Sequence, residues 1–149
     1  MFTEECIRGS IFFTLSMVIK KIEFTLRNEA KLGPWQVISP GSSNAIGYVE
    51  FVKDLKDVQF KVYERNTILL TQLVGGNEEI PRNVVGLVIV DSRDYPDILA
   101  HVSVRARNLG VLFSVCFDDK VCAELVAQKG KWIDLKVLKQ DLLEVNISF

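Results

Sequence analysis

Apolar and polar positions divide the chain near Gly33. Before it, apolar residues spaced by three or four form one face of a helical segment that we predict over residues 3–30. Acidic residues come first in this segment and basic residues later, which is the order that the helix dipole favours. Because Gly33-Pro34 ends the helical spacing, we expect an N-terminal helical segment, residues 1–32, followed by a domain over residues 33–149.

After this boundary, short runs of β-branched residues alternate with stretches of helical spacing. The predicted strands cover residues 35–39, 46–52, 67–74, 84–90, 111–117 and 132–137, with a last strand through Val145, Ile147 and Phe149. The predicted helices cover residues 54–63, 98–108 and 119–128. The dense apolar runs at 67–74 and 84–90 are typical of strands buried on both faces. This alternation indicates a mixed α/β domain.

The bulk composition excludes several classes of protein. The chain is 48% hydrophobic and 25% charged, and its net charge of -1 gives no reason to expect a nucleic acid or a membrane as partner. The apolar run at 11–19 is too short for a membrane span, which needs about 20 residues, so a buried helix is the better interpretation. With one histidine in the chain, a Cys/His zinc site is nearly excluded. We interpret Cys6, Cys116 and Cys122 as reduced thiols, with Cys116 in the core.

A polar stretch that leads into a predicted helix carries the candidate chemistry. The helix is predicted to begin near His101, where free backbone N–H groups and the positive end of the helix dipole stabilise a phosphate. Arg105 lies four residues on, on the same helical face, and can bind phosphoryl oxygens in bidentate fashion. Ser103 can donate a hydroxyl group. Arg107 lies on another face and can reach a partner or a neighbouring loop.

Two interpretations of this histidine are open at this point. Neutral imidazole is a good nucleophile near pH 7 and its bond to phosphorus is labile, so His101 suits a phosphoryl relay. A lone histidine is, however, more often a packed or capping residue, and Arg105 and Arg107 would then form an ordinary solvated face.

No metal or cofactor site is predicted in the chain. Gly75-Gly76 lacks the Lys-Ser/Thr that follows in a phosphate-binding loop. The acidic residues that could suggest magnesium are interpreted as loop and capping residues. They are Glu78, Glu79, Asp91, Asp94 and Asp97.

The run HVSVRARN at 101–108, with Asp97 and Leu99 before it, closely resembles the phosphohistidine motif of the α-glucan, water dikinases. It is similar, more loosely, to the swivelling phosphohistidine domains of pyruvate, phosphate dikinase and phosphoenolpyruvate synthase. Other segments that resemble the family are LGPWQVISP at 32–40, GYV at 47–49, EEIP at 78–81 and CFD at 116–118. The likeness runs from about residue 2 to about residue 138.

The resemblance implies a swivelling β/β/α phosphohistidine domain that works as a relay. A nucleotide-binding domain would place the β-phosphate of ATP on His101, releasing AMP and inorganic phosphate, and His101 would phosphorylate a glucosyl unit of a starch-like α-glucan. Arg105 would be the phosphate clamp, with Ser103 and Arg107 in support. ATP and Mg²⁺ would bind on the nucleotide-binding domain, outside this chain. The family points to the plastid, with a cytoplasmic paralogue as the alternative.

The chain also departs from the family. Ala100 stands where the family carries a hydroxyl residue, and Phe12 and Phe13 stand where small residues are usual. Family members are far longer, so we expect the isolated chain to be inactive without a nucleotide-binding domain. Two other hypotheses are a truncated, non-catalytic remnant that acts at most as an interaction module, and a free-standing phosphocarrier served by a separate kinase.

Overall fold

The computed structural model describes residues 15, 18, 35–91, 93–139 and 142–148. By its internal contacts the chain divides into two compact units, Met1–Gly33 and Pro34–Phe149. The predictions for residues 3–30, including the buried helix at 11–19, Cys6, Phe12 and Phe13, lie outside the described residues apart from Leu15 and Val18.

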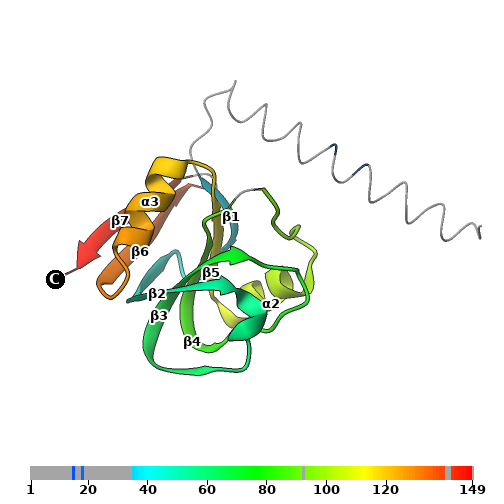
Figure 1. The fold of residues 1–149 in the computed structure, drawn as a ribbon, viewed down its shortest axis with the longest axis horizontal. Coiled ribbons are helices and arrows are strands. Elements are labelled where there is room, and N and C mark those ends of the chain that lie inside the picture. Colours follow the sequence, from blue (N-terminus) through cyan, green and yellow to red (C-terminus); the bar gives the residue numbers. More distant parts are fainter. Residues whose placement is uncertain (1–14, 16–17, 19–34, 92, 140–141, 149) are drawn as a thin grey trace, which may run out of the picture. The chain divides into compact units, whose positions relative to one another are not determined.

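The described part of the second unit is built on one seven-stranded mixed sheet (Figure 1). Its strands are β1 Trp35–Pro40, β2 Asn44–Asp54, β3 Val62–Leu73, β4 Arg82–Ile89, β5 Leu112–Cys116, β6 Trp132–Lys139 and β7 Leu142–Ser148. They lie in the order β1-β5-β4-β3-β2-β6-β7. The four central strands, β5, β4, β3 and β2, run parallel to one another, whereas β1, β6 and β7 pair antiparallel. The predicted mixed α/β class is therefore confirmed.

Each face of the central strands has its own apolar cluster. Along β3, Leu69 belongs to one cluster and its neighbours Ile68 and Leu70 to the other, and all three are fully buried. Successive strand residues point to opposite faces, so these strands are buried on both sides, as their dense apolar runs predicted. Helix α2, His101–Leu109, packs into the first cluster, and helix α3, Asp119–Ala127, packs into the second.

Helix α2 is fixed to the sheet by its buried face. Val102 and Ala106 are four residues apart, face the same cluster and are 0% exposed. Their burial determines which way the other residues of the helix point, and so it sets the direction of His101 and Arg105.

The helix predicted over residues 54–63 is wrong. The structure has a short 3-10 helix η1, Leu55–Asp57, and β3 begins at Val62. Leu55 is fully buried but Phe60 is 81% exposed, so the segment lacks the continuous apolar face that a packed helix needs. The Asp54 carboxylate accepts from the Lys56 N–H and favours a tight turn instead.

The cysteines of the second unit are core residues. Cys116 and Cys122 are free thiols and are 1% and 7% exposed, so the core position predicted for Cys116 is confirmed. The hydrogen bond with the Cys116 thiol and burial hold the pKa of the Cys122 thiol above its ordinary value. Cys122 therefore stays protonated, and a protonated thiol is a poor nucleophile.

Candidate functional site

Helix α2 begins at His101, close to its predicted start. Ala100 has the extended backbone of an N-cap residue, with φ -60° and ψ 151°, and its side chain makes no capping hydrogen bond. The turn before it is held by Asp97, whose carboxylate accepts from the Leu99 N–H at 2.7 Å. This turn places His101 at the first position of the helix, where its side chain is 45% exposed.

The loop between β3 and β4 contacts this end of the helix. The Val102 N–H donates to the Gly76 carbonyl at 2.9 Å, and the Glu78 carboxylate accepts from the Gly75 and Gly76 N–H groups at 2.8 Å each. Gly76 has φ +112°, a conformation that favours glycine. One of the helix N–H groups expected to face a phosphate is therefore taken by the loop.

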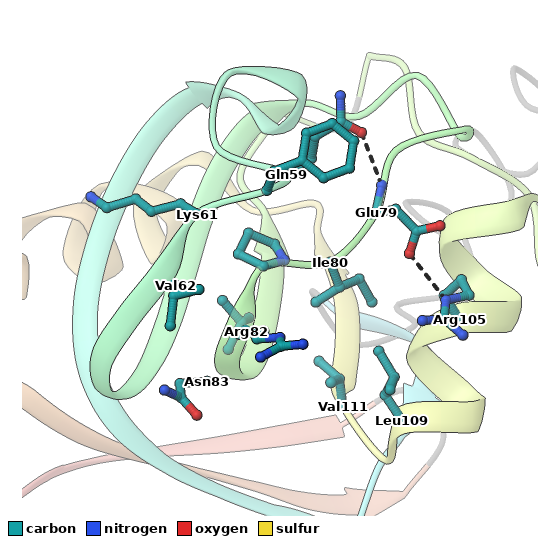
Figure 2. Close-up of a pocket in the computed structure, with 13 residues that line it drawn as sticks. Gln59, Lys61, Val62, Glu79, Ile80, Arg82, Asn83, Arg105, Leu109 and Val111 are labelled. Atoms are coloured by element: carbon teal, nitrogen blue, oxygen red, sulfur yellow. Dashed lines mark hydrogen bonds and ion pairs between the residues drawn. The ribbon is translucent and has the colours of Figure 1, made fainter.

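Glu79, from the same loop, binds both His101 and Arg105. Its Oε1 lies 2.7 Å from His101 Nε2, and its Oε2 accepts from Arg105 Nε at 3.1 Å (Figure 2 shows the bond to Arg105). The hydrogen bond with His101, and after it the one with Arg105, hold the pKa of Glu79 below its ordinary value. Since an ionised carboxylate only accepts hydrogen bonds, His101 Nε2 is the donor in this pair.

The four residues named from the sequence fall into two groups. His101 and Arg105 point to the same side and meet at Glu79. Ser103 is fully buried and its hydroxyl donates to the Asp97 carbonyl at 2.7 Å, while the Arg107 guanidinium donates to the Ile98 carbonyl. In the described part of the chain, no hydrogen bond joins Ser103 or Arg107 to the first group.

Glu79 was not predicted as a site residue and was interpreted as a loop acid. It lies 22 residues before His101, so no helical or strand spacing connects the two. Gln59 was also missed, although its Oε1 accepts from the Glu79 N–H at 3.1 Å and holds the loop in place. The one signal available was the segment EEIP at 78–81, which resembles the family and contains Glu79.

A pocket of about 600 Å³ opens beside the Glu79–Arg105 pair (Figure 2). Its polar lining includes Gln59, Lys61, Arg82 and Asn83, and its apolar lining includes Ile80, Leu109 and Val111. A molecule in this pocket would lie against the carboxylate that binds His101.

The acidic side chains near the site have local partners. Glu78 accepts from its own loop, Glu79 binds His101, Asp91 pairs with the arginine two residues on, and Asp97 accepts from the N–H two residues on. No group of three or more His, Cys, Asp or Glu side chains among the described residues could hold a metal ion. The site brings together an imidazole, a group that can act as a nucleophile, and a guanidinium, a group that can bind an anion.

None of the helices in the described ranges has the length and apolar character of a membrane span.

The comparison with known families identifies one family over nearly the whole of the second unit. The family described as "Alpha-glucan water dikinase, phosphohistidine-like domain" matches residues 34–148. The chain belongs to this family. The family predicted from the motif at 101–108 is therefore confirmed.

Relatives in this family are plant dikinases. The alpha-glucan water dikinase, chloroplastic, of Solanum tuberosum is 45% identical over 98% of this chain and 10% of its own length. The protein of the same name from Citrus reticulata is 46% identical over 95% and 9%. Alpha-glucan water dikinase 1, chloroplastic, of Arabidopsis thaliana is 43% identical over 99% and 10%. These names support the plastid location predicted from the resemblance.

The chain spans about a tenth of the length of these curated relatives. No solved structure matches it.

Proposed function

We propose that this domain is the phosphoryl carrier of an alpha-glucan water dikinase, with His101 as the residue that is phosphorylated. The observation that carries the proposal is the position of His101: first in helix α2, half exposed, with Arg105 beside it. Because the chain belongs to a phosphohistidine-like family, a histidine in this position is the candidate for phosphorylation. The name of the relatives supports an α-glucan as the final acceptor.

The proposed reaction has two steps. In the first, a ring nitrogen of His101 bonds to the β-phosphorus of ATP as the bond from this phosphorus to the oxygen of the α-phosphate breaks, and AMP leaves with that electron pair. One water molecule cleaves the link to the γ-phosphate, which leaves as inorganic phosphate. In the second, a glucosyl hydroxyl oxygen attacks the phosphorus, and the imidazole takes back the electron pair of the N–P bond. ATP and Mg²⁺ would bind on a nucleotide-binding domain of the full-length protein, and the domain described here would swivel between that domain and the glucan.

Arg105 and the helix start would support the transfer by different means. Transfer of a phosphoryl group depends mainly on positioning and on neutralisation of charge. The Arg105 guanidinium would bind the phosphoryl oxygens. Ser103 and Arg107 would act through the turn before the helix, because both donate to carbonyl groups of that turn.

Reconstitution with a nucleotide-binding domain tests the proposal. The chain incubated alone with ATP labelled with ³²P at the β-position should take up no label, and addition of the nucleotide-binding domain of a relative should produce an acid-labile, alkali-stable label. Because the chain has one histidine, that stability pattern assigns the label to His101. A nucleotide-binding domain that is active on its native carrier but leaves this chain unlabelled would favour the interaction-module hypothesis instead.

Replacement of Arg105 by alanine should slow this labelling about 100-fold, the loss typical when one donor to a developing anion is removed. The side chain is 40% exposed, so the fold should be unaffected. Arg105→Lys is the matched control, because it keeps the charge without the planar fork and should recover part of the rate. The measurement is the initial rate of ³²P transfer, with circular dichroism as the check on folding. Undiminished labelling of Arg105→Ala would refute the clamp role.

A further inference from the structure

The Glu79 carboxylate lies between the two groups that a phosphoryl group on His101 would also contact. One carboxylate oxygen is 2.7 Å from His101 Nε2 and the other is 3.1 Å from Arg105 Nε. A phosphoryl group on His101 would be bonded to Nε2 and would present its oxygens to Arg105 Nε. Carboxylates and phosphoryl groups are anions that accept hydrogen bonds from the same donors.

We infer that Glu79 holds the place of the phosphoryl group while His101 is unphosphorylated, and that phosphorylation of Nε2 displaces it. This inference rests on the proposed function and adds to it the residue that occupies the site in the resting state.

Two physical reasons exclude the simultaneous presence of both anions. A phosphorus atom bonded to Nε2 would lie closer to the ring than the carboxylate oxygen does now, so the two would overlap. The phosphoryl group also carries close to two negative charges, and like charges at contact distance repel. Arg105 alone cannot neutralise both groups, so it would exchange one anion for the other.

Glu79 is also the group that would accept the proton of Nε2 before the N–P bond forms. Nε2 donates its hydrogen to the ionised carboxylate, so its ring electron pair becomes free to bond phosphorus only when that proton leaves. Nδ1 first takes a proton from solvent, because a neutral imidazole that lost its Nε2 proton would become an imidazolate anion. The Nε2 proton then moves to Glu79 Oε1, which leaves a neutral imidazole whose free electron pair is on Nε2. The N–P bond then forms as the bond between phosphorus and the leaving group breaks, and the leaving group takes that electron pair. Glu79 is uncharged as it moves away and releases its proton to solvent afterwards.

The contacts of the loop make a return of Glu79 favourable. The Glu79 N–H is held by Gln59 Oε1, and Glu78 holds the turn before it, so the carboxylate remains close to the histidine. When the phosphoryl group leaves, Glu79 regains both of its partners. This competition should shorten the lifetime of the phosphohistidine and promote onward transfer.

The first test measures the resting state. The intact chain, with ¹⁵N in its histidine, is studied by long-range ¹H–¹⁵N correlation, in which the single imidazole gives one set of signals. We expect the proton on Nε2 in the native chain and a mixture of tautomers in Glu79→Ala. A native imidazole protonated mainly on Nδ1 would contradict the inference.

The second test phosphorylates the chain with potassium phosphoramidate, whose phosphoryl group moves to histidine as ammonia leaves. We expect phosphorylation on Nε2, a large shift of the Glu79 backbone amide, and a phosphohistidine that decays about fivefold more slowly in Glu79→Gln, as loss of one repelling charge near the surface predicts. The matched control is Glu124→Gln, which makes the same change at an exposed position of helix α3, on the other face of the sheet, and its decay rate should equal that of the native chain.

The outcomes separate this inference from the proposed function. Phosphorylation on Nδ1 with Nε2 still bound to Glu79, or equal decay in Glu79→Gln and the native chain, would overturn the place-holding role and leave the carrier role intact. Conversely, the phosphoramidate results can be as expected while the nucleotide-binding domain fails to label the chain. In that case the place-holding contact stands and the relay from ATP does not.

Discussion

Replacement of His101 by asparagine should abolish phosphoryl transfer to the chain from ATP in the presence of the nucleotide-binding domain. Asparagine is close to histidine in size and keeps polar atoms near Glu79, but its amide nitrogen is not a nucleophile. Removal of a nucleophile lowers rates by several orders of magnitude, on the order of 10⁶-fold where it has been isolated, so no acid-labile label should be detectable. The measurement is incorporation of ³²P after acid and alkali treatment.

The control for this result introduces a histidine elsewhere on the same helix. Asn108 is exposed and lies seven residues after His101, about 10 Å further along the helix. A chain with both His101→Asn and Asn108→His has one imidazole, as the native chain does, but two turns from the helix start. It should also remain unlabelled, which would show that position matters and not only the presence of a histidine. Labelling that survives His101→Asn would remove this residue from the mechanism.

The parts of the fold that could be predicted are those in which local pattern and tertiary packing agree. The runs at 67–74 and 84–90 are mostly apolar on both faces, and such runs are typical of strands in the middle of a parallel sheet. Residues 54–63 were mispredicted because apolar spacing alone cannot tell whether a side chain will be covered. Leu55 and Val58 are three residues apart, as one face of a helix requires, yet Phe60 is 81% exposed in the structure.

The candidate site could also be predicted only where its contacts are local. His101 and Arg105 are four residues apart on one helix, so geometry local to that helix brings them together. Glu79 and Gln59 come from other parts of the chain, and their contacts depend on how the loop between β3 and β4 packs. The burial of Ser103 could have been anticipated, because two residues along a helix correspond to about 200° of rotation away from His101.

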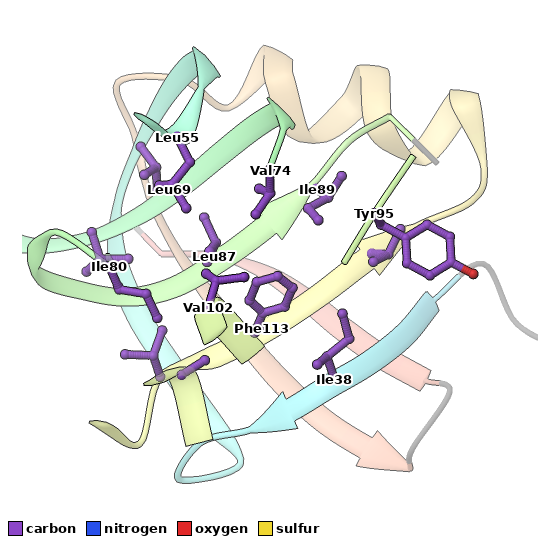
Figure 3. Close-up of a cluster of buried hydrophobic side chains, with 14 of the residues drawn as sticks. Ile38, Leu55, Leu69, Val74, Ile80, Leu87, Ile89, Tyr95, Val102 and Phe113 are labelled. Atoms are coloured by element: carbon purple, nitrogen blue, oxygen red, sulfur yellow. The ribbon is translucent and has the colours of Figure 1, made fainter. Parts of the chain in front are cut away.

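The second large effect concerns the packing beneath helix α2. Phe113 of β5 is fully buried in the cluster that also contains Leu87 and Val102 (Figure 3). Truncation of a buried phenylalanine to alanine costs about 3–5 kcal/mol, which is a large part of the roughly 5–15 kcal/mol that stabilises a domain. We expect Phe113→Ala to lower the free energy of unfolding by this amount in urea titrations followed by circular dichroism.

The matched control is Phe60→Ala, since it removes the same atoms from a side chain that is 81% exposed. Its free energy of unfolding should stay within about 0.5 kcal/mol of the native value. Because Val102 follows His101 directly and packs in the same cluster as Phe113, the cavity left by Phe113→Ala should also loosen the start of α2. The His101 tautomer should then become mixed below the unfolding transition in this variant and not in Phe60→Ala. Equal stability of the two variants would mean that the cluster under α2 does not hold the helix that carries His101.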